Sequence, residues 1–131
     1  MENTSTTFVL LSDSESDPTT SCEHRLYVTR VHLEARLPAL NRHNHIGLNL
    51  YSVSNISINP FSQALVSTGI AIQTPNGTYG RIETVHEMGT RGVHVNASIV
   101  DCQYTGTLMV LLSNLTRNIV TLNKTVPIAQ L

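Results

Sequence analysis

The hydrophobic pattern of this chain is that of short β-strands separated by turns. In several stretches apolar and polar residues alternate with a period of two, which is typical of strands with one face in a core. The predicted strands recur about every ten residues, at 26–33, 46–53, 56–59, 65–73, 78–85, 93–101, 107–115, 119–124 and 126–131. No stretch supports a helix longer than about three turns. The spacing predicts an all-β sandwich, jelly roll or barrel.

Glycine and proline mark the predicted turns. Pro60 separates two strands, and the triplet 75–77 (Pro-Asn-Gly) is a strong turn signal. Gly69 lies inside the strand 65–73, where we expect it to cause a bend or bulge. The segment 86–92 contains two glycines, so it can form only a loop or a single helical turn. The segment 34–45 is predicted to be a loop, because Pro38 breaks any helix there.

Composition and charge narrow the class of partners. The chain has 131 residues, of which 40% are hydrophobic and 13% charged, as expected for one globular domain. Residues 1–25 contain five acids and one base, whereas residues 26–131 contain four acids and seven bases, which gives −4 and +3. A mildly basic domain is compatible with an anionic ligand such as a nucleotide. It lacks the basic stripe that duplex nucleic acid requires.

The first 24 residues form a separate compositional unit. Their run SDSESDP is acidic and rich in serine, so we expect a disordered tail at 1–24 before a folded domain at 25–131. The apolar run FVLL (8–11) is too short for a signal peptide, and no stretch approaches a membrane span. The two cysteines, Cys22 and Cys102, are therefore expected to be reduced, in a protein of the cytoplasm or nucleus that is not secreted.

Few side chains are available for acid–base or metal chemistry. Asp101 is the only aspartate after Asp17, so carboxylate chemistry in the folded domain must use Asp101 or one of three glutamates, Glu34, Glu83 and Glu87. The alternative is that Asp101, at the end of a strand, only accepts backbone hydrogen bonds in a turn. His43 and His45 have no third ligand nearby, so no metal site is assigned.

Three stretches together resemble the trimeric dUTPase family. Residues 46–52, IGLNLYS, are similar to its first motif, an AGYDLYS-like sequence. Residues 75–82, PNGTYGRI, and then 92–106, GVHVNASIVDCQYTG, resemble the approach to the second motif and the third motif. Residues 110–131 resemble the strand pair that ends in the fourth motif, G-D-R-I-A-Q-L. The order and intervals agree from about residue 26 to the end.

This resemblance implies a dUTPase-like β jelly roll that forms a homotrimer, with active sites between subunits. The family hydrolyses dUTP to dUMP and pyrophosphate, and Mg²⁺ holds the phosphates. By position in the motifs, the resemblance implies that Asp101 activates the water and that Tyr104 packs against the deoxyribose. Arg81 matches a scaffold position, and Gln130 matches the glutamine of the fourth motif. The alternative for Tyr104 is plain packing in the core or the turn.

The motifs that handle phosphate depart from the family pattern. Asn49 stands where the first motif has Asp, although an asparagine can still hydrogen-bond a strand end. The second motif, P-R-S-G-L, is replaced by residues 84–88, Thr-Val-His-Glu-Met, so Val85 and His86 replace its phosphate-binding Arg and Ser. Glu87 brings a negative charge that repels a triphosphate unless a metal intervenes. His86 can equally be an ordinary loop histidine.

Two further departures concern the end of the chain and the supply of positive charge. Pro127 replaces the arginine of the fourth motif, and the fifth motif, a Gly-rich arm, is expected to be absent because the sequence stops at Leu131. Arg91 is the nearby residue that could replace the lost positive charge. An alternative is that the sequence is a fragment cut before the fifth motif, which would not account for Val85 or Asn49.

Two functions follow from the resemblance. The favoured hypothesis is a divergent, viral dUTPase-like protein that is catalytically impaired and acts as a binding or regulatory module for host proteins. The alternative is an active dUTP diphosphatase that needs Mg²⁺. Two surfaces are candidates for a protein partner, the acidic tail and the C-terminal residues 129–131. In the family those C-terminal residues belong to a core strand, which argues against the second surface.

Overall fold

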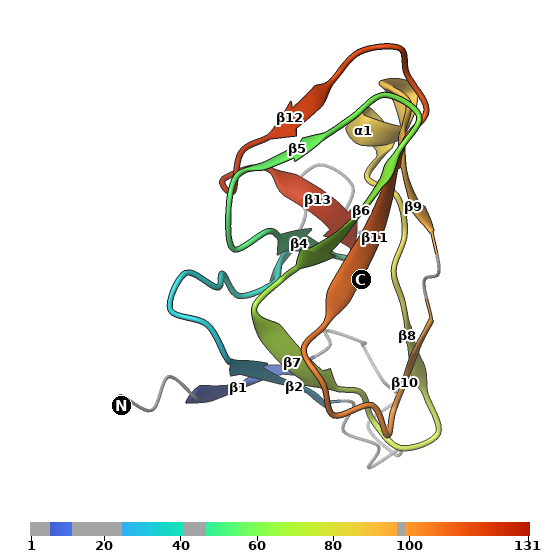
Figure 1. Cartoon of the computed structure of the whole chain (residues 1–131). Helices are drawn as coiled ribbons and strands as arrows, with labels where there is room; N and C mark the ends of the chain where they lie inside the picture. Colours follow the sequence, from blue (N-terminus) through green and yellow to red (C-terminus); the bar gives the residue numbers. More distant parts are fainter. Residues whose placement is uncertain (1–5, 12–24, 41–46, 97–98) are drawn as a thin grey trace.

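A computed structural model describes residues 6–11, 25–40, 47–96 and 99–131, and within these ranges the fold is almost entirely β-structure (Figure 1). The elements are β1 (Thr6–Leu11), β2 (Arg25–Arg30), β3 (Ala39–Leu40), β4 (Leu48–Tyr51), β5 (Ile56–Ile58), β6 (Gln63–Ser67), β7 (Ile70–Gln73), β8 (Tyr79–Arg81), α1 (His86–Thr90), β9 (Val93–Asn96), β10 (Ile99–Asp101), β11 (Met109–Asn114), β12 (Val120–Leu122) and β13 (Pro127–Gln130). Of the two alternatives for 86–92, a loop or a single helical turn, the structure has the helical turn, α1.

The described strands pair into five small antiparallel sheets, in the orders β1-β2-β7, β10-β8, β6-β11-β9, β12-β5 and β13-β4-β3. Most partners are remote in sequence, for example β13 with β4 and β12 with β5. The chain therefore passes repeatedly from one layer to the other, as in a jelly roll. The predicted all-β jelly-roll class is confirmed.

The core is built from the inward-facing residues of these strands. Its fully buried side chains are mostly Val, Ile and Leu, which suit a pleated surface. The largest of them are Leu50, Ile58, Ile70, Leu108, Leu112, Ile128, Val28, Val93 and Val110. Of residues 129–131, Ala129 is fully buried, Gln130 and Leu131 are half-buried, and the backbone of Leu131 exchanges two hydrogen bonds with Leu48, so this segment is part of the β-structure. Within the described ranges no helix has the length and apolar character needed to cross a bilayer.

The prediction of a disordered segment at 1–24 is wrong for residues 6–11. These residues form β1, which pairs with the whole of β2, from Thr6 opposite Arg30 to Leu11 opposite Arg25. Their sequence, TTFVLL, is rich in residues that favour strands, and β2 offers a free edge. The rest of the predicted tail lies outside the described residues, as do His43, His45 and Cys22.

The stretch 93–101, predicted as one strand, is two strands in different sheets. β9 pairs with β11, whereas β10 pairs with β8. The alternation of apolar and polar residues continues through both, so the sequence gives no sign of the change of partner. This change carries the end of β10 away from the β11 sheet and positions the turn that follows it.

Gly69 makes the bend predicted inside 65–73. It separates β6 from β7 and has a φ of +69°, in the left-handed region that favours glycine. A Cβ atom at this position would lie 2.4 Å from a methyl carbon of Val53 and 2.9 Å from the Cβ of Ala35. The bend therefore requires glycine for its conformation and for its lack of a side chain.

Candidate functional site

The candidate site begins at the turn that follows β10. Asp101 is the last residue of the strand, and its carbonyl oxygen accepts a 2.9 Å hydrogen bond from the backbone N–H of Tyr104. Its side-chain Oδ1 accepts a second 2.9 Å bond from the N–H of Gln103, which is the arrangement of an Asx turn. The carboxylate thus stabilises the turn, as expected from the alternative that Asp101 accepts backbone hydrogen bonds there. It is nevertheless exposed, so its other oxygen is free for other contacts.

Tyr104 folds back over the same turn. Its hydroxyl donates a 2.8 Å hydrogen bond to the carbonyl oxygen of Thr107. A Cβ atom on Gly106 would lie 2.8 Å from that hydroxyl oxygen, so the ring would have to shift if this residue had a side chain. The ring is held by this bond while 44% of the residue remains exposed.

Asp101 and Tyr104 line one pocket of 230 Å³. The other lining residues are apolar and come from β10, from the residue after β8 and from the residues at the start of β11 and just before it: Ile82, Ile99, Val100, Leu108 and Met109. A slot with apolar walls, one carboxylate and one phenol suits a small ring compound that carries a few polar groups. The structure therefore brings together the two residues on which the resemblance places the chemistry.

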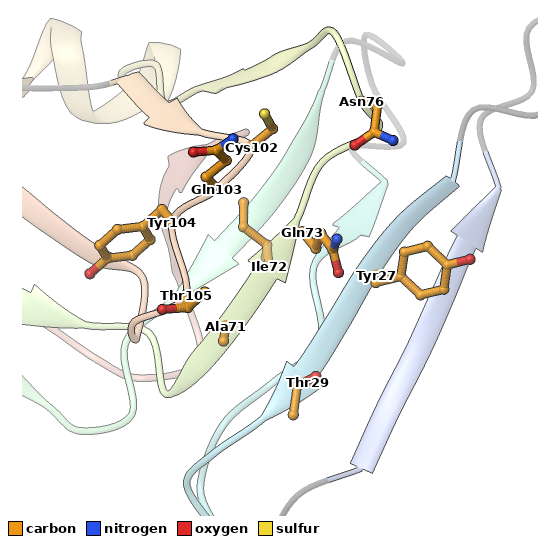
Figure 2. Close-up of a pocket in the computed structure, with 10 residues that line it drawn as sticks. All are labelled: Tyr27, Thr29, Ala71, Ile72, Gln73, Asn76, Cys102, Gln103, Tyr104 and Thr105. Atoms are coloured by element: carbon orange, nitrogen blue, oxygen red, sulfur yellow. The ribbon is translucent and has the colours of Figure 1, made fainter.

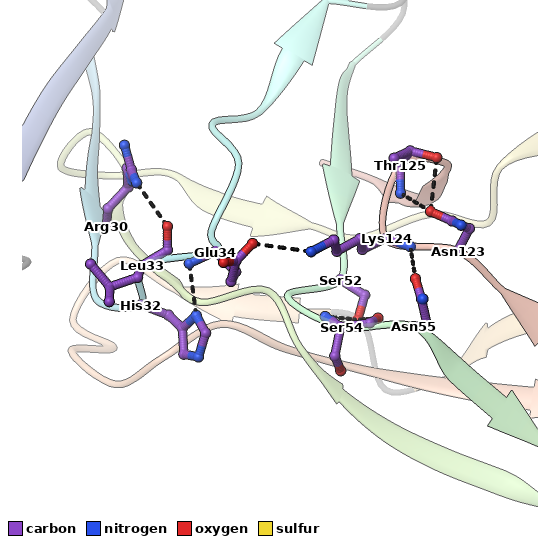
Figure 3. Close-up of polar contacts among 10 residues, drawn as sticks. All are labelled: Arg30, His32, Leu33, Glu34, Ser52, Ser54, Asn55, Asn123, Lys124 and Thr125. Atoms are coloured by element: carbon purple, nitrogen blue, oxygen red, sulfur yellow. Dashed lines mark hydrogen bonds and ion pairs between the residues drawn. The ribbon is translucent and has the colours of Figure 1, made fainter.

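The other candidate carboxylates are engaged elsewhere. Glu34 forms an exposed ion pair with Lys124 at 3.1 Å, in a cluster that ties the loop after β2 to the turn before β13 (Figure 3). Glu83 pairs with Arg81, and Glu87 lies in the first turn of α1. Among the described residues, Asp101 is thus the carboxylate that lines a pocket and has no cationic partner.

A second group of predicted residues lies on one face of the strands β8, β13 and β4. Gln130 is directly opposite Asn49 in the β13–β4 pair and directly opposite Glu83 in an isolated bridge. Residues opposite each other in an antiparallel pair have side chains on the same face. Arg81 joins this row through its ion pair with Glu83, whose side chain is 54% exposed.

Two features of this row were not expected. Glu83 is expected from the sequence only as one of the available carboxylates and is not assigned to this row, although its position two residues after Arg81 on a predicted strand would place both side chains on one face. The Oδ1 atom of Asn49 is buried and has no hydrogen-bond partner among the described residues. An acceptor that is buried without a donor is costly to folding stability.

The third group surrounds α1. His86 is the first residue of the helix, Arg91 is its C-cap, and both are exposed. Val85 and Met88 are buried in the core, so they anchor the segment. Glu87 is the charged residue of the first turn, where it interacts favourably with the positive end of the helix dipole. The segment that corresponds to the second motif is thus a core-anchored helix with an acidic first turn.

One chain does not bring the three groups together. α1 and the end of β10 lie at opposite ends of the molecule, and the β4–β13 pair lies between them (Figure 1). Arg81 is nevertheless close to Asp101 in the sheet, because Ile99 is directly opposite Arg81 and Asp101 is directly opposite Tyr79, which puts Arg81 and Asp101 on the same face of the β8–β10 pair. His86 and Arg91 on α1 therefore form the group that is separate from the Asp101 turn. A site that uses both needs more than one copy of the chain.

The described residues do not form a resident Mg²⁺ site. They contain no group of three or more His, Cys, Asp or Glu side chains that could hold a metal ion. Mg²⁺ in phosphoryl-transfer sites is usually bound by one or two carboxylates together with substrate phosphates and water. Asp101 alone supplies no more than one such ligand, so the described residues do not fit a metal that is bound before the substrate.

Comparison with known proteins agrees with this architecture. The model of the dUTPase family matches residues 34–131. The deoxyuridine 5'-triphosphate nucleotidohydrolase of Paramecium bursaria Chlorella virus 1 is 34% identical over 107 residues, which cover 81% of this chain and 76% of that protein. The corresponding protein of Saccharomyces cerevisiae is 33% identical over 98 residues, covering 74% and 67%. The chain belongs to the dUTPase family.

Solved structures show the same fold. The dUTPase of phage phi11 of S. aureus superposes with a TM-score of 0.74 at 17% identity, over 80% of this chain and 86% of that one. A mutant of that phage dUTPase coordinates a structural Mg(II) ion. The EIAV dUTPase gives a TM-score of 0.65 at 24% identity, over 73% and 82%. At these identities the likeness establishes the dUTPase fold and not the chemistry.

Proposed function

We propose that this protein is a dUTPase-like module that holds a deoxyuridine-type nucleoside but handles the phosphates poorly, and that it acts by binding or regulation. The observation that carries this proposal is the second-motif segment. Val85 stands where the family has its phosphate-binding arginine and is buried in the core, while Glu87 adds an anion to the first turn of α1. A carboxylate without a compensating cation repels a polyphosphate.

The energetic consequence is large. Removing one charged or hydrogen-bonding contact to a reacting group commonly costs about 3 kcal/mol of transition-state stabilisation. In this chain several such contacts are replaced, and Arg81 is already paired with Glu83. The 230 Å³ pocket, which we call the nucleoside pocket, differs from these phosphate motifs in keeping the residues that the family pattern leads us to expect, because Asp101 and Tyr104 both line it. Nucleoside binding without efficient hydrolysis is the combination that these features support.

We propose the homotrimer of the family for this chain as well. The position of α1, at the opposite end of the molecule from β10, supports this, because a neighbouring copy would be needed to bring His86 and Arg91 to the Asp101 turn. We further propose that the protein is a viral member that acts in the cytoplasm or nucleus of a host cell and binds host proteins. Viral relatives, such as that of the Chlorella virus, are consistent with this origin.

An active Mg²⁺-dependent dUTP diphosphatase is the second candidate function. Asp101 favours it, since the carboxylate is exposed, borders the pocket and has only one described side-chain hydrogen bond. Arg91, exposed at the end of α1, would then supply positive charge from a neighbouring copy.

A turnover assay decides between the two. The full chain is incubated with dUTP and Mg²⁺, and pyrophosphate release is followed beside an Asp101→Asn variant. The impaired module gives no release above the variant. Calorimetry should then show deoxyuridine and dUTP binding with similar affinity, since the phosphates contribute little.

Two other results of these measurements would contradict the proposal. Turnover that Asp101→Asn abolishes would establish the enzyme and overturn the proposal. Absence of both turnover and nucleoside binding would overturn both candidate functions and leave only the fold. Sedimentation equilibrium tests the trimer independently, and a monomer at concentrations above those used for calorimetry would contradict it.

A further inference from the structure

A second and larger pocket lies beside the turn that carries Asp101. Its volume is 580 Å³, and it opens between the strands β2 and β7 and the turn residues 102–105 (Figure 2). The two pockets share only Tyr104 among their lining residues. Pockets of roughly 300–1,000 Å³ are the usual size for small-molecule ligands. This pocket is separate from the nucleoside pocket, and none of the residues assigned to phosphate binding lines it.

Paired residues of the strands β2 and β7 form one wall of the pocket. Tyr27 of β2 and Gln73 of β7 are directly opposite each other, so their side chains stand on the same face of the sheet. Figure 2 shows the Gln73 amide between the Tyr27 ring and the turn 102–105. On the other side of β7, the N–H of Leu108 donates a 2.7 Å bond to the Ile70 carbonyl, which fixes the segment after this turn against the strand.

Among the described residues, the lining is polar but carries no formal charge. None of the ten residues that line the pocket has a charged side chain, so a phosphate or carboxylate would lose its hydration without compensation. Three carboxamides reach it from three different segments, those of Gln73, Asn76 and Gln103, and none has a side-chain hydrogen-bond partner among the described residues. Each offers a donor and an acceptor side by side.

We propose that this pocket binds a neutral purine nucleoside. A carboxamide pairs in bidentate fashion with the N6 and N7 edge of adenine, and a tyrosine ring provides a stacking surface for any base. Gln73 and Tyr27 supply these two functions on one face. Asn76 and Gln103, which also line the pocket, are the groups that we assign to a sugar hydroxyl. The proposal concerns a site distinct from the Asp101 pocket and does not depend on the function proposed for it.

Calorimetric titration of the full chain with adenosine tests the proposal. Saturable binding is expected, weakened about tenfold in Gln73→Ala through loss of the bidentate pair. Tyr27→Ala should weaken binding, whereas Tyr27→Phe, which keeps the ring, should bind within about twofold of the parent. Gln63→Ala is the matched control, because Gln63 is exposed on β6 and does not line the pocket.

Competition separates this site from the nucleoside pocket. Saturating deoxyuridine should not displace adenosine, and Asp101→Asn should leave adenosine binding intact. Displacement by deoxyuridine, or loss of adenosine binding in Asp101→Asn, would place the purine in the other pocket and overturn the proposal. Equal weakening by Gln63→Ala, no saturable binding up to about 10 mM, or binding of glucose in preference to adenosine would overturn it as well.

Discussion

Arg81 and Glu83 form an ion pair two residues apart on the strand face that also holds Gln130 and Asn49. Their side chains are 67% and 54% exposed, so the pair contributes little to folding stability. The pair does affect the binding of charged ligands. The Arg81 guanidinium that would attract an anion at this face is accompanied by the Glu83 carboxylate, so the pair presents no net charge.

Neutralising Glu83 is therefore expected to improve anion binding. In Glu83→Gln the guanidinium of Arg81 loses its partner, and affinity for pyrophosphate should rise about two- to fivefold at low salt, the range expected for an exposed pair. The gain should fall away at about 0.5 M salt, where exposed charges are screened. Calorimetric titration with pyrophosphate at both salt concentrations measures it.

The control is Glu34→Gln, which removes an exposed carboxylate that is paired with Lys124. It changes the net charge by the same amount at a different surface. If Glu34→Gln strengthens binding as much as Glu83→Gln, the effect comes from net charge alone and the role assigned to the Arg81–Glu83 pair is wrong.

The hydrogen bond between Tyr104 and Thr107 can be tested in the same way. Tyr104→Phe keeps the ring but removes the hydroxyl that donates to the Thr107 carbonyl. Because the residue is 44% exposed, the free energy of unfolding should change by less than about 1 kcal/mol. Deoxyuridine affinity should fall about two- to tenfold, because the ring is no longer fixed beside the pocket.

Tyr79→Phe serves as the comparison, because Tyr79 is 62% exposed on β8 and lines neither the nucleoside pocket nor the larger pocket beside it. Calorimetry and urea denaturation on the two variants separate binding from stability. Unchanged deoxyuridine affinity in Tyr104→Phe would show that the hydroxyl does not position the ring.

Local features of the fold are predictable from the sequence. The turn after Asp101, the bend at Gly69 and the helical turn at 86–90 each follow from residues within a few positions of each other. The resemblance also locates Asp101 and Tyr104, which the fold then places on one pocket. Features that depend on remote pairing are not predictable in this way.

Three features illustrate this limit. The row from Glu83 through Gln130 to Asn49 exists only because β13 lies between residues 83 and 49, and no local pattern encodes that pairing. The division of 93–101 is hidden because a period of two does not identify the partner strand. β1 is not predicted from the sequence, because the acidic run that follows this strand dominates the composition of the first 24 residues.

Gly69 and Gly77 form a natural pair for separating backbone strain from crowding. Both have positive φ, +69° and +80°, but a Cβ on Gly77 meets nothing within 4 Å, whereas one on Gly69 would contact Val53, Ala35 and His32 below 3.0 Å. Gly77→Ala should cost about 1–2 kcal/mol of unfolding free energy, and Gly69→Ala about 1–3 kcal/mol more. Urea denaturation measures both, and equal costs would show that the core at Val53 relaxes freely.

Asn114 provides the sharpest test of the core. It is fully buried, and its amide nitrogen Nδ2 donates to the carbonyl oxygens of Ile58, Asn59 and Asn118 at 3.0, 3.2 and 2.8 Å. Its Oδ1 accepts a 2.9 Å bond from the N–H of Thr116. One side chain therefore holds the turn after β5 against the turn after β11.

Asn114→Asp replaces this donor with an oxygen that faces three carbonyl oxygens. At pH 7 the variant should lose about 3 kcal/mol or more of unfolding free energy, because a buried carboxylate would be left unpaired. Burial and the facing carbonyls should raise its folded-state pKa above the unfolded value of about 3.9. The deficit should then be smallest below about pH 4 and grow as pH rises through the folded pKa. Urea denaturation between pH 4 and 8 measures this trend relative to Asn118→Asp, whose exposed side chain should show little loss. A deficit that does not depend on pH would mean that the new carboxylate has reached solvent and that the turns have separated.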